Sequence, residues 1–222
     1  MKKYIIIVAG GSGTRMNSAV PKQFIELQGK PMLMHTIEKF VNAIPEINVI
    51  VVLAKQFHDE WKKLCKTHHF KFSIQLADGG ETRFHSVKNG LTLVPAACVV
   101  GVHDAARPFI NSEIIIEGFK IAEKKGNAIP AIPLSESIRK VENGTNKAVE
   151  RSKYFIIQTP QCFHSTLLKN AFLQEYHPGF TDDASVLEGI GEKINLIEGN
   201  RENIKITTPQ DLIIAEAMQR IK

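Results

Sequence analysis

The sequence predicts an α/β fold in which a mostly parallel, twisted sheet carries helices on both faces. Five strand-length apolar runs, rich in Ile and Val, alternate with segments of helical periodicity. Such alternation is typical of a parallel sheet whose two faces are covered by the connecting helices. A length of 222 residues with 43% apolar content fits one α/β domain. We therefore expect a single Rossmann-like domain over residues 1–222.

The expected elements follow in a regular order. Strands are predicted at residues 4–9, 49–54, 72–76, 99–103 and 128–132. Helices are predicted at residues 31–41, 58–66, 83–93, 112–125, 167–175, 183–187 and 209–221.

A polar stretch at residues 134–151 interrupts the alternation. An Asn-Gly turn signal, Asn143-Gly144, lies between two short extended runs and predicts a protruding β-hairpin arm. An arm with so few apolar residues is not stable alone. It must therefore lie against the domain or against another subunit.

The charge and the apolar runs exclude several classes of protein. The net charge is +5, yet no basic run exceeds two residues and no aromatic residues interleave with a basic stripe. A nucleic-acid-binding surface would need both, whereas a small polyanionic substrate needs only a few focused cations. The apolar runs are far shorter than the roughly 20 residues of a membrane span. We expect no nucleic-acid partner and no membrane insertion.

The cysteines and the N-terminus indicate a cytoplasmic protein. Cys65, Cys98 and Cys162 are an odd number without a C-x-x-C pair, so neither a disulfide framework nor a zinc site is expected. The first apolar stretch meets glycines at once and lacks a signal-peptide cleavage site.

The strongest chemical signal follows the first predicted strand. Gly10, Gly11 and Gly13 let the backbone approach a bulky anion, and Arg15 and Lys22 follow. A flexible turn would explain the glycines alone, but the two cations suit a triphosphate. The loop lacks the Gly-Lys-Ser/Thr of a P-loop and misses the dinucleotide fingerprint. A nicotinamide cofactor is therefore disfavoured.

Two further segments lie where open α/β sheets bind ligands. Asp104 follows an apolar strand and either holds Mg²⁺ through a carboxylate oxygen or caps the following turn. The neighbouring His103 is expected to be structural, because histidine is a poor Mg²⁺ ligand. The second segment is a glycine-bearing turn at residues 78–83, followed by Ser86. Its amides suit a base or a ribose, and a simple tight turn explains the glycines equally well.

Several motifs together resemble known nucleotidyltransferases. The opening motifs, Gly11-Ser12-Gly13-Thr14-Arg15 and Pro21-Lys22-Gln23-Phe24, resemble those of sugar-nucleotide pyrophosphorylases. The later motifs are His103-Asp104-Ala105-Ala106-Arg107-Pro108, Gln158-Thr159-Pro160-Gln161, Thr181-Asp182-Asp183-Ala184-Ser185 and Asn203-Ile204-Lys205-Ile206-Thr207. In this order they are similar to the bacterial 2-C-methyl-D-erythritol 4-phosphate cytidylyltransferases, from the first strand to the last helix.

The resemblance implies a reaction and a set of site residues. The reaction joins CTP to a phosphorylated polyol and releases pyrophosphate. The implied catalytic residues are Arg15, Lys22 and Lys205, the last in a short strand. The implied nucleotide-binding residues are Ala9, Gly10, Gly11, Gly13, Gly80, Glu81, Ser86, Asp104 and Ala105. The implied acceptor-binding residues are Ser137, Arg151, Thr159 and Thr181. Relatives often carry Asp in place of Glu81 and Thr in place of Ser137.

The resemblance also implies Mg²⁺ at Asp104 and a homodimer formed through the arm. Three alternatives remain open at this point. Ribitol 5-phosphate is used by a closely similar cytidylyltransferase family that shares the glycine loop. A non-catalytic nucleotide-binding module would keep that loop without chemistry. A nucleic-acid-binding protein would explain the net charge, and its affinity would fall steeply with salt.

Overall fold

A central sheet organises the molecule in the computed structural model, which describes residues 1–9 and 21–220. Its eight strands run in the order β10-β7-β11-β6-β1-β4-β5, with β12 paired to β7. Their bounds are β1 (Lys3–Val8), β4 (Asn48–Leu53), β5 (Ile74–Asp78), β6 (Val99–Asp104), β7 (Asn127–Pro133), β10 (Phe155–Ile157), β11 (Gln161–His164) and β12 (Leu196–Glu198). The pairs β1–β4, β1–β6, β4–β5 and β12–β7 are parallel, and β11 and β10 are antiparallel to their neighbours. The predicted, mostly parallel α/β sheet is confirmed.

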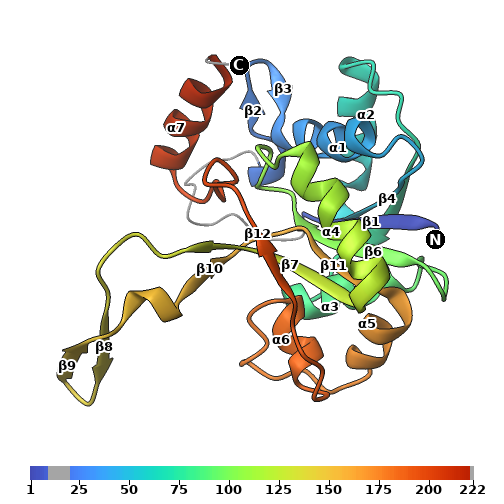
Figure 1. The fold of residues 1–222 in the computed structure, drawn as a ribbon. Helices are drawn as coiled ribbons and strands as arrows, with labels where there is room; N and C mark the ends of the chain where they lie inside the picture. Colours follow the sequence, from blue (N-terminus) through green and yellow to red (C-terminus); the bar gives the residue numbers. More distant parts are fainter. Residues whose placement is uncertain (10–20, 221–222) are drawn as a thin grey trace.

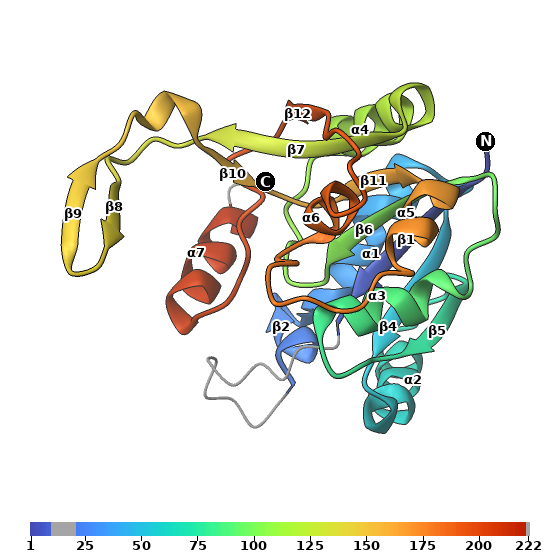
Figure 2. The same cartoon turned by 90° about the horizontal axis from the view of Figure 1, so that it is seen from below.

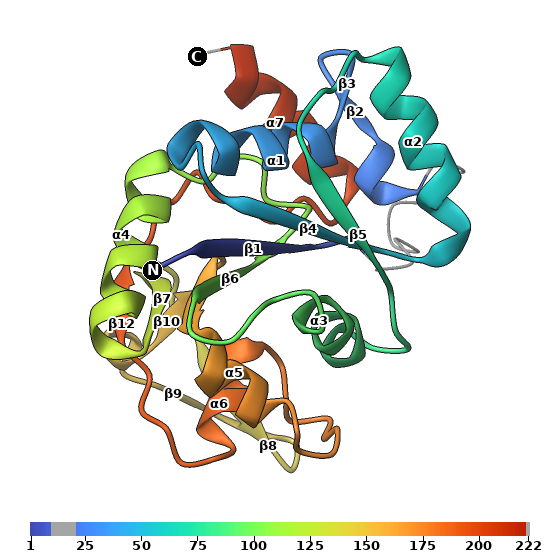
Figure 3. The same cartoon turned by 90° about the vertical axis from the view of Figure 1, so that its right-hand side faces the viewer.

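Helices cover both faces of this sheet (Figures 1 and 3). One face carries α1 (Met32–Ala43), α2 (His58–Thr67) and α4 (Ser112–Lys125), and the other carries α3 (Arg83–Leu91), α5 (Ser165–Ala171) and α6 (Asp183–Glu188). Alternate residues of β1 explain the two layers, because Ile5 and Ile7 belong to one buried cluster and Ile6 belongs to the other.

The C-terminal helix forms a third, smaller cluster. Helix α7 (Pro209–Arg220) begins at a proline, which suits the first helical position. Its Ala215 packs with Leu27 and Met32, which lie around the short hairpin of β2 (Glu26–Leu27) and β3 (Lys30–Pro31). Two 3₁₀ turns, η2 (Lys22–Phe24) and η3 (Lys55–Phe57), directly precede β2 and α2 in the sequence.

The predicted hairpin arm projects from the body of the molecule (Figures 1 and 2). It consists of β8 (Arg139–Glu142) and β9 (Thr145–Ala148), and it returns through the 3₁₀ turn η4 (Arg151–Lys153). Asn143 and Gly144 have φ values of 48° and 75°, as a tight Asn-Gly hairpin turn requires. Every residue of the two strands is exposed.

Some expected elements differ from the observed ones. The strands β10, β11 and β12 were not predicted, because segments of three or four residues are too short to show periodicity. The short strand predicted around Lys205 was wrong. Residues 203–207 belong to no strand, and the amide of Ile206 donates to the carbonyl of Ala106 instead. This bond holds the segment against the loop that follows β6.

No helix within residues 1–9 and 21–220 has both the length and the apolar character that a membrane span requires.

Candidate active site

The carboxyl ends of four parallel strands bring the predicted segments to one edge of the sheet. Val8 pairs with Asp104 on one side and with Val52 on the other, and Leu53 pairs with Asp78. The chain therefore leaves β1, β6 and β5 at the same edge. Open α/β sheets bind their ligands at this edge.

Asp104 is the centre of a charged cluster at this edge. Its Oδ2 lies 2.8 Å from Lys205 Nζ and 3.6 Å from Arg107 Nε, and its Oδ1 lies 3.4 Å from Arg83 Nε. Burial would raise the pKa of the Asp104 carboxyl, but Arg83, Lys205 and Arg107 together hold it well below its ordinary value. Asp104 is therefore a permanent anion among three cations.

Arg83 also joins a second carboxylate. Its Nη1 and Nη2 lie 2.9 and 2.7 Å from Oδ1 and Oδ2 of Asp183, whose side chain is only 1% exposed. This fork-to-fork geometry is the strong bidentate form of an arginine–carboxylate pair. Among the residues that the structure describes, the cluster thus holds three cations and two carboxylates, which leaves one excess positive charge.

Lys205 is positioned by the buried amide of Asn203. Asn203 Nδ2 donates to the carbonyl of Thr159 over 2.8 Å, and Arg107 Nη1 donates to the carbonyl of Asn203 over 2.6 Å. Asn203 is fully buried, so these bonds are shielded from water. They explain why a lysine outside any strand reaches Asp104.

His103 has a structural role, as expected. It is fully buried, and burial lowers its pKa to about 4, so the ring is neutral at pH 7. The carbonyl of Arg107 lies 3.1 Å from Nε2 and only accepts, so Nε2 carries the proton and Nδ1 accepts from the Thr159 hydroxyl 3.0 Å away. The same hydroxyl accepts from the amide of Asp104 over 3.1 Å. His103 and Thr159 therefore fix the backbone that carries Asp104.

Ser86, one of the predicted nucleotide-binding residues, closes the glycine-bearing turn after β5. The Gly80 amide donates to Ser86 Oγ over 3.0 Å, and Ser86 Oγ donates to the carbonyl of Thr82 over 3.0 Å. A Cβ on Gly80 would lie 2.4 Å from the Cβ of His85, so any other residue here would force the turn to shift. The structure thus brings Gly80 and Ser86 together, and it leaves the side chain of Glu81 exposed.

The segments predicted to bind the acceptor meet through Gln161. Its Nε2 donates to Asp182 Oδ2 over 2.7 Å, and its Oε1 accepts from the amide of Ala184 over 2.9 Å. Asp182 also forms a capping box with Ser185 at the start of α6. The exposed Thr181 directly precedes this cap.

Two acceptor candidates lie beside the arm instead. Ser137 is exposed in the chain that enters β8. Arg151 is exposed in η4, and its Nη1 donates to the carbonyl of Ser135 over 2.6 Å. This bond ties Arg151 to the outgoing side of the arm.

The remaining predicted residues fall into two groups. Gly10, Gly11, Gly13 and Arg15 lie outside the described residues. Ala9 and Ala105 are buried at the ends of β1 and β6, where the amide of Ala105 donates to the carbonyl of Val8. Lys22 begins η2 and is half-buried.

Sequence reasoning missed Arg83, Arg107 and Asp183 as site residues. All three lie inside motifs that the sequence analysis identified, next to or close to residues that were predicted to belong to the site. Their ion pairs join segments far apart in the chain, and a single sequence carries no signal for such pairing. A charged residue at the first position of a helix could have marked Arg83 and Asp183 individually, but not the ion pair between them.

The donor set around Asp104 fits a metal ion only if the phosphates supply most ligands. Within the part of the chain that the structure describes, no three His, Cys, Asp or Glu side chains gather into a metal site. Mg²⁺ commonly binds proteins through one or two carboxylates plus substrate phosphates. Asp104 matches that pattern as a single hard ligand.

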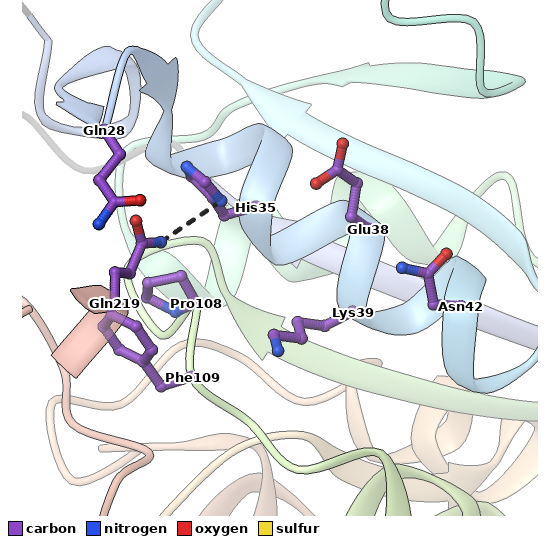
Figure 4. Close-up of a pocket in the computed structure, with 8 residues that line it drawn as sticks. All are labelled: Gln28, His35, Glu38, Lys39, Asn42, Pro108, Phe109 and Gln219. Carbon is purple, nitrogen blue, oxygen red and sulfur yellow. Dashed lines mark hydrogen bonds between the residues drawn. The ribbon is translucent and has the colours of Figure 1, made fainter. Parts of the chain in front are cut away.

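A separate cavity of about 280 Å³ lies between α1, the loop after β6 and α7 (Figure 4). His35 forms part of its wall, with Nε2 2.9 Å from the carbonyl of Leu27 and Nδ1 3.5 Å from Nε2 of Gln219. Its lining residues are Gln28, His35, Glu38, Lys39, Asn42, Pro108, Phe109 and Gln219. None of the predicted site residues that the structure describes lines it, so this cavity lies apart from the Asp104 cluster.

The fold and the basic cluster at the carboxyl edge, together with the sequence motifs, define a nucleotidyltransferase. The family model of 2-C-methyl-D-erythritol 4-phosphate cytidylyltransferase matches residues 4–220. The chain therefore belongs to this enzyme family.

Relatives support the same assignment. The chain is 51% identical to a 2-C-methyl-D-erythritol 4-phosphate cytidylyltransferase from Bacteroides thetaiotaomicron, over 98% of this chain and 100% of the relative. It is 40% identical to one from Bacillus licheniformis, over 98% and 96%. The ribitol 5-phosphate and non-catalytic alternatives are not favoured.

Solved structures share the fold. A 4-diphosphocytidyl-2C-methyl-D-erythritol synthase from Anaerococcus prevotii superposes with a TM-score of 0.84 at 28% identity, covering 99% of this chain and 96% of that chain. A 2-C-methyl-D-erythritol 4-phosphate cytidylyltransferase from Francisella tularensis gives a TM-score of 0.80 at 32% identity, covering 98% and 99%.

Proposed function

We propose that this enzyme transfers the cytidylyl group of CTP to 2-C-methyl-D-erythritol 4-phosphate. A phosphate oxygen of the acceptor attacks the α-phosphorus of CTP in line. The new P–O bond forms as the bond to the β-phosphate breaks, which gives 4-diphosphocytidyl-2-C-methyl-D-erythritol and pyrophosphate. The observation that carries the proposal is the cluster of Lys205, Arg83 and Arg107 around Asp104.

The chemistry needs no general base, because the attacking phosphate is already an anion. The obstacle is repulsion between two polyanions and the charge that grows on the departing pyrophosphate. Catalysis then depends on positioning and on fixed positive charge. The excess positive charge of the Asp104 cluster supplies part of this, and Arg15 and Lys22 are proposed to supply the rest.

Asp104 has two functions in this proposal. Its carboxylate holds Lys205 Nζ at 2.8 Å, and so fixes a cation at the edge where the phosphates bind. It is also the residue that would hold Mg²⁺ together with the phosphates. When bound, Mg²⁺ would offset part of the negative charge of the phosphates.

The cytidine is proposed to lie against the turn after β5 and the glycine loop after β1. Gly80, Glu81 and Ser86 supply the first surface, and Ala9, Gly10, Gly11, Gly13 and Ala105 supply the second. The hydrogen bond from the Gly80 amide to Ser86 Oγ closes this turn, which supports the proposal of a rigid surface for the cytidine. For the acceptor we propose Thr159, Thr181, Ser137 and Arg151.

We also propose a homodimer in which the arm reaches a second copy. Strand β10 is the edge of the sheet and pairs only with β7 in the described sheet. Tyr154, Phe155 and Ile156 on this edge are each more than 40% exposed. Exposed apolar residues on an open strand edge favour coverage by another chain. Arg151 would then serve the neighbouring site.

A complementation experiment tests the shared site. An Arg151→Ala chain mixed with a Lys22→Ala chain should regain activity that neither homodimer has, because each mixed dimer holds one intact site. A monomer in sedimentation at assay concentration, or no regain after mixing, would contradict the dimer.

The chain is further proposed to act as one domain in the cytoplasm. One sheet draws its strands from the whole length between β1 and β12, as a single domain requires. The three cysteines are free thiols, two of them buried, as suits a reducing compartment.

The activity itself is tested by pyrophosphate release. Each nucleoside triphosphate is assayed with and without 2-C-methyl-D-erythritol 4-phosphate. We expect release with CTP and the acceptor together. Release that does not depend on the acceptor, or that prefers another triphosphate, would contradict the proposal.

A further inference from the structure

We infer that Arg83 is a positioning residue that couples the nucleotide turn to the acceptor segment, an inference that rests on the proposed function. The guanidinium of Arg83 joins three elements of the site: its own helix α3, the start of α6 and the end of β6. None of these contacts requires Arg83 to touch a substrate.

The first end of the coupling is the nucleotide turn. Arg83 is the first residue of α3, directly after the turn that Gly80 and Ser86 close. Thr82 caps the helix by accepting from the amide of His85, and its carbonyl accepts from the amide of Ser86. The backbone of Arg83 therefore moves with the turn.

The second end is the acceptor segment. Asp183 is the first residue of α6 and lies two positions after Thr181. The capping box of Asp182 and its bond to Gln161 anchor this helix start to β11. Because Asp183 is fully buried and bound at both oxygens by Arg83, a shift of one helix start displaces the other.

The third contact joins this pair to Asp104. Arg83 Nε lies 3.4 Å from Asp104 Oδ1, on the opposite carboxylate oxygen from Lys205. The guanidinium thus transmits the position of either helix start to the carboxylate at the centre of the cluster.

Aromatic packing offers a second link between the same elements. Phe84 stacks on Phe172 at 4.7 Å and on Phe180 at 5.8 Å between ring centroids. If aromatic packing alone held the nucleotide turn and the acceptor segment together, the ion pair between Arg83 and Asp183 would stabilise the fold but would not couple nucleotide binding to acceptor binding. The Phe84→Leu variant weakens this packing and leaves the ion pair intact, so it is the matched control.

The test uses the double variant Arg83→Gln/Asp183→Asn. Removing one partner would leave a buried charge unpaired and destabilise the fold, whereas removing both avoids that penalty. Acceptor affinity is measured by calorimetry with and without the non-cleavable α,β-methylene analogue of CTP. Thermal unfolding is recorded for each variant to show that it is folded.

We expect the CTP analogue to raise acceptor affinity at least about fivefold in the unmodified enzyme and in Phe84→Leu, the size typical of coupling between sites. The factor should fall to about one in the double variant. Arg83→Lys keeps the positive charge but loses the two-pronged guanidinium contact with Asp183, so its coupling factor should lie between those of the unmodified enzyme and the double variant. An unchanged factor in the double variant, or no coupling in the unmodified enzyme, would overturn the inference.

Turnover of CTP and 2-C-methyl-D-erythritol 4-phosphate by the unmodified enzyme is measured in parallel. An enzyme that turns over but shows no coupling contradicts only the role of Arg83. An enzyme without turnover contradicts the proposed function.

Discussion

Lys205 Nζ lies 2.8 Å from Oδ2 of Asp104 and joins the segment before α7 to the end of β6. The carboxylate holds the lysine where phosphates are proposed to bind, so each side chain depends on the other. In Asp104→Asn the lysine loses its charged partner, and in Lys205→Ala the phosphates lose a cation.

Both substitutions should lower kcat on the order of 10² to 10³-fold, as the loss of one fixed electrostatic contact typically does. Steady-state kinetics of each variant measures the effect. The matched controls are Asp59→Asn and Lys120→Ala, whose side chains are exposed on α2 and α4. If either site variant keeps the kcat of its control, that side chain has no part in catalysis.

Removal of divalent cations should abolish turnover. The one excess positive charge of the described Asp104 cluster cannot by itself offset the charge of a triphosphate and an acceptor phosphate that meet at one phosphorus. The assay is run with excess EDTA and then restored with Mg²⁺. Full activity in the chelator would refute the proposed metal.

Alanine at Gly80 should disturb the nucleotide turn. Its Cβ would lie 2.4 Å from His85 Cβ and 2.8 Å from the His85 carbonyl carbon, so the turn must shift. Overpacking of this kind costs about 1 to 3 kcal/mol. We expect a lower Tm and a higher KM for CTP. Gly79→Ala, whose nearest contact is 3.3 Å, is the control and should change both much less.

His103 should make the fold sensitive to mild acid. Its pKa of about 4 lies below the ordinary 6.5, so the unfolded chain takes up the proton first as the pH falls. Stability is therefore lost between about pH 6.5 and pH 4, by about 3 kcal/mol in all, and is flat below that range. Chemical unfolding of the unmodified protein and of His103→Gln across this range measures the difference. Equal pH slopes for the two proteins would contradict the buried neutral ring.

The sequence predicted the layers of the fold because they depend on local patterns. Helix α4 has the predicted bounds, since an amphipathic run ends at Gly126, whose φ of 92° suits a glycine after a helix. Strand β11 lies between β6 and β7 in the sheet, although it follows both in the sequence. It was not predicted, because its four residues carry too little periodic pattern.

The sequence indicated Asp104 and Lys205 separately, through their motifs. It gave no sign of the pair between Arg83 and Asp183, because two charged residues in polar motifs are ordinarily solvated. The fold alone brings the first residue of α3 against the first residue of α6, where the Asp183 carboxylate is buried. Tertiary pairing of this kind has no local periodicity to predict it.

The most direct test of the account compares two acceptors with CTP at saturating Mg²⁺. The value of kcat/KM is measured for 2-C-methyl-D-erythritol 4-phosphate and for ribitol 5-phosphate. The two polyols differ in their methyl and hydroxyl groups, so the acceptor pocket alone must discriminate between them. The account predicts a clear preference for 2-C-methyl-D-erythritol 4-phosphate, and a preference for ribitol 5-phosphate would contradict it.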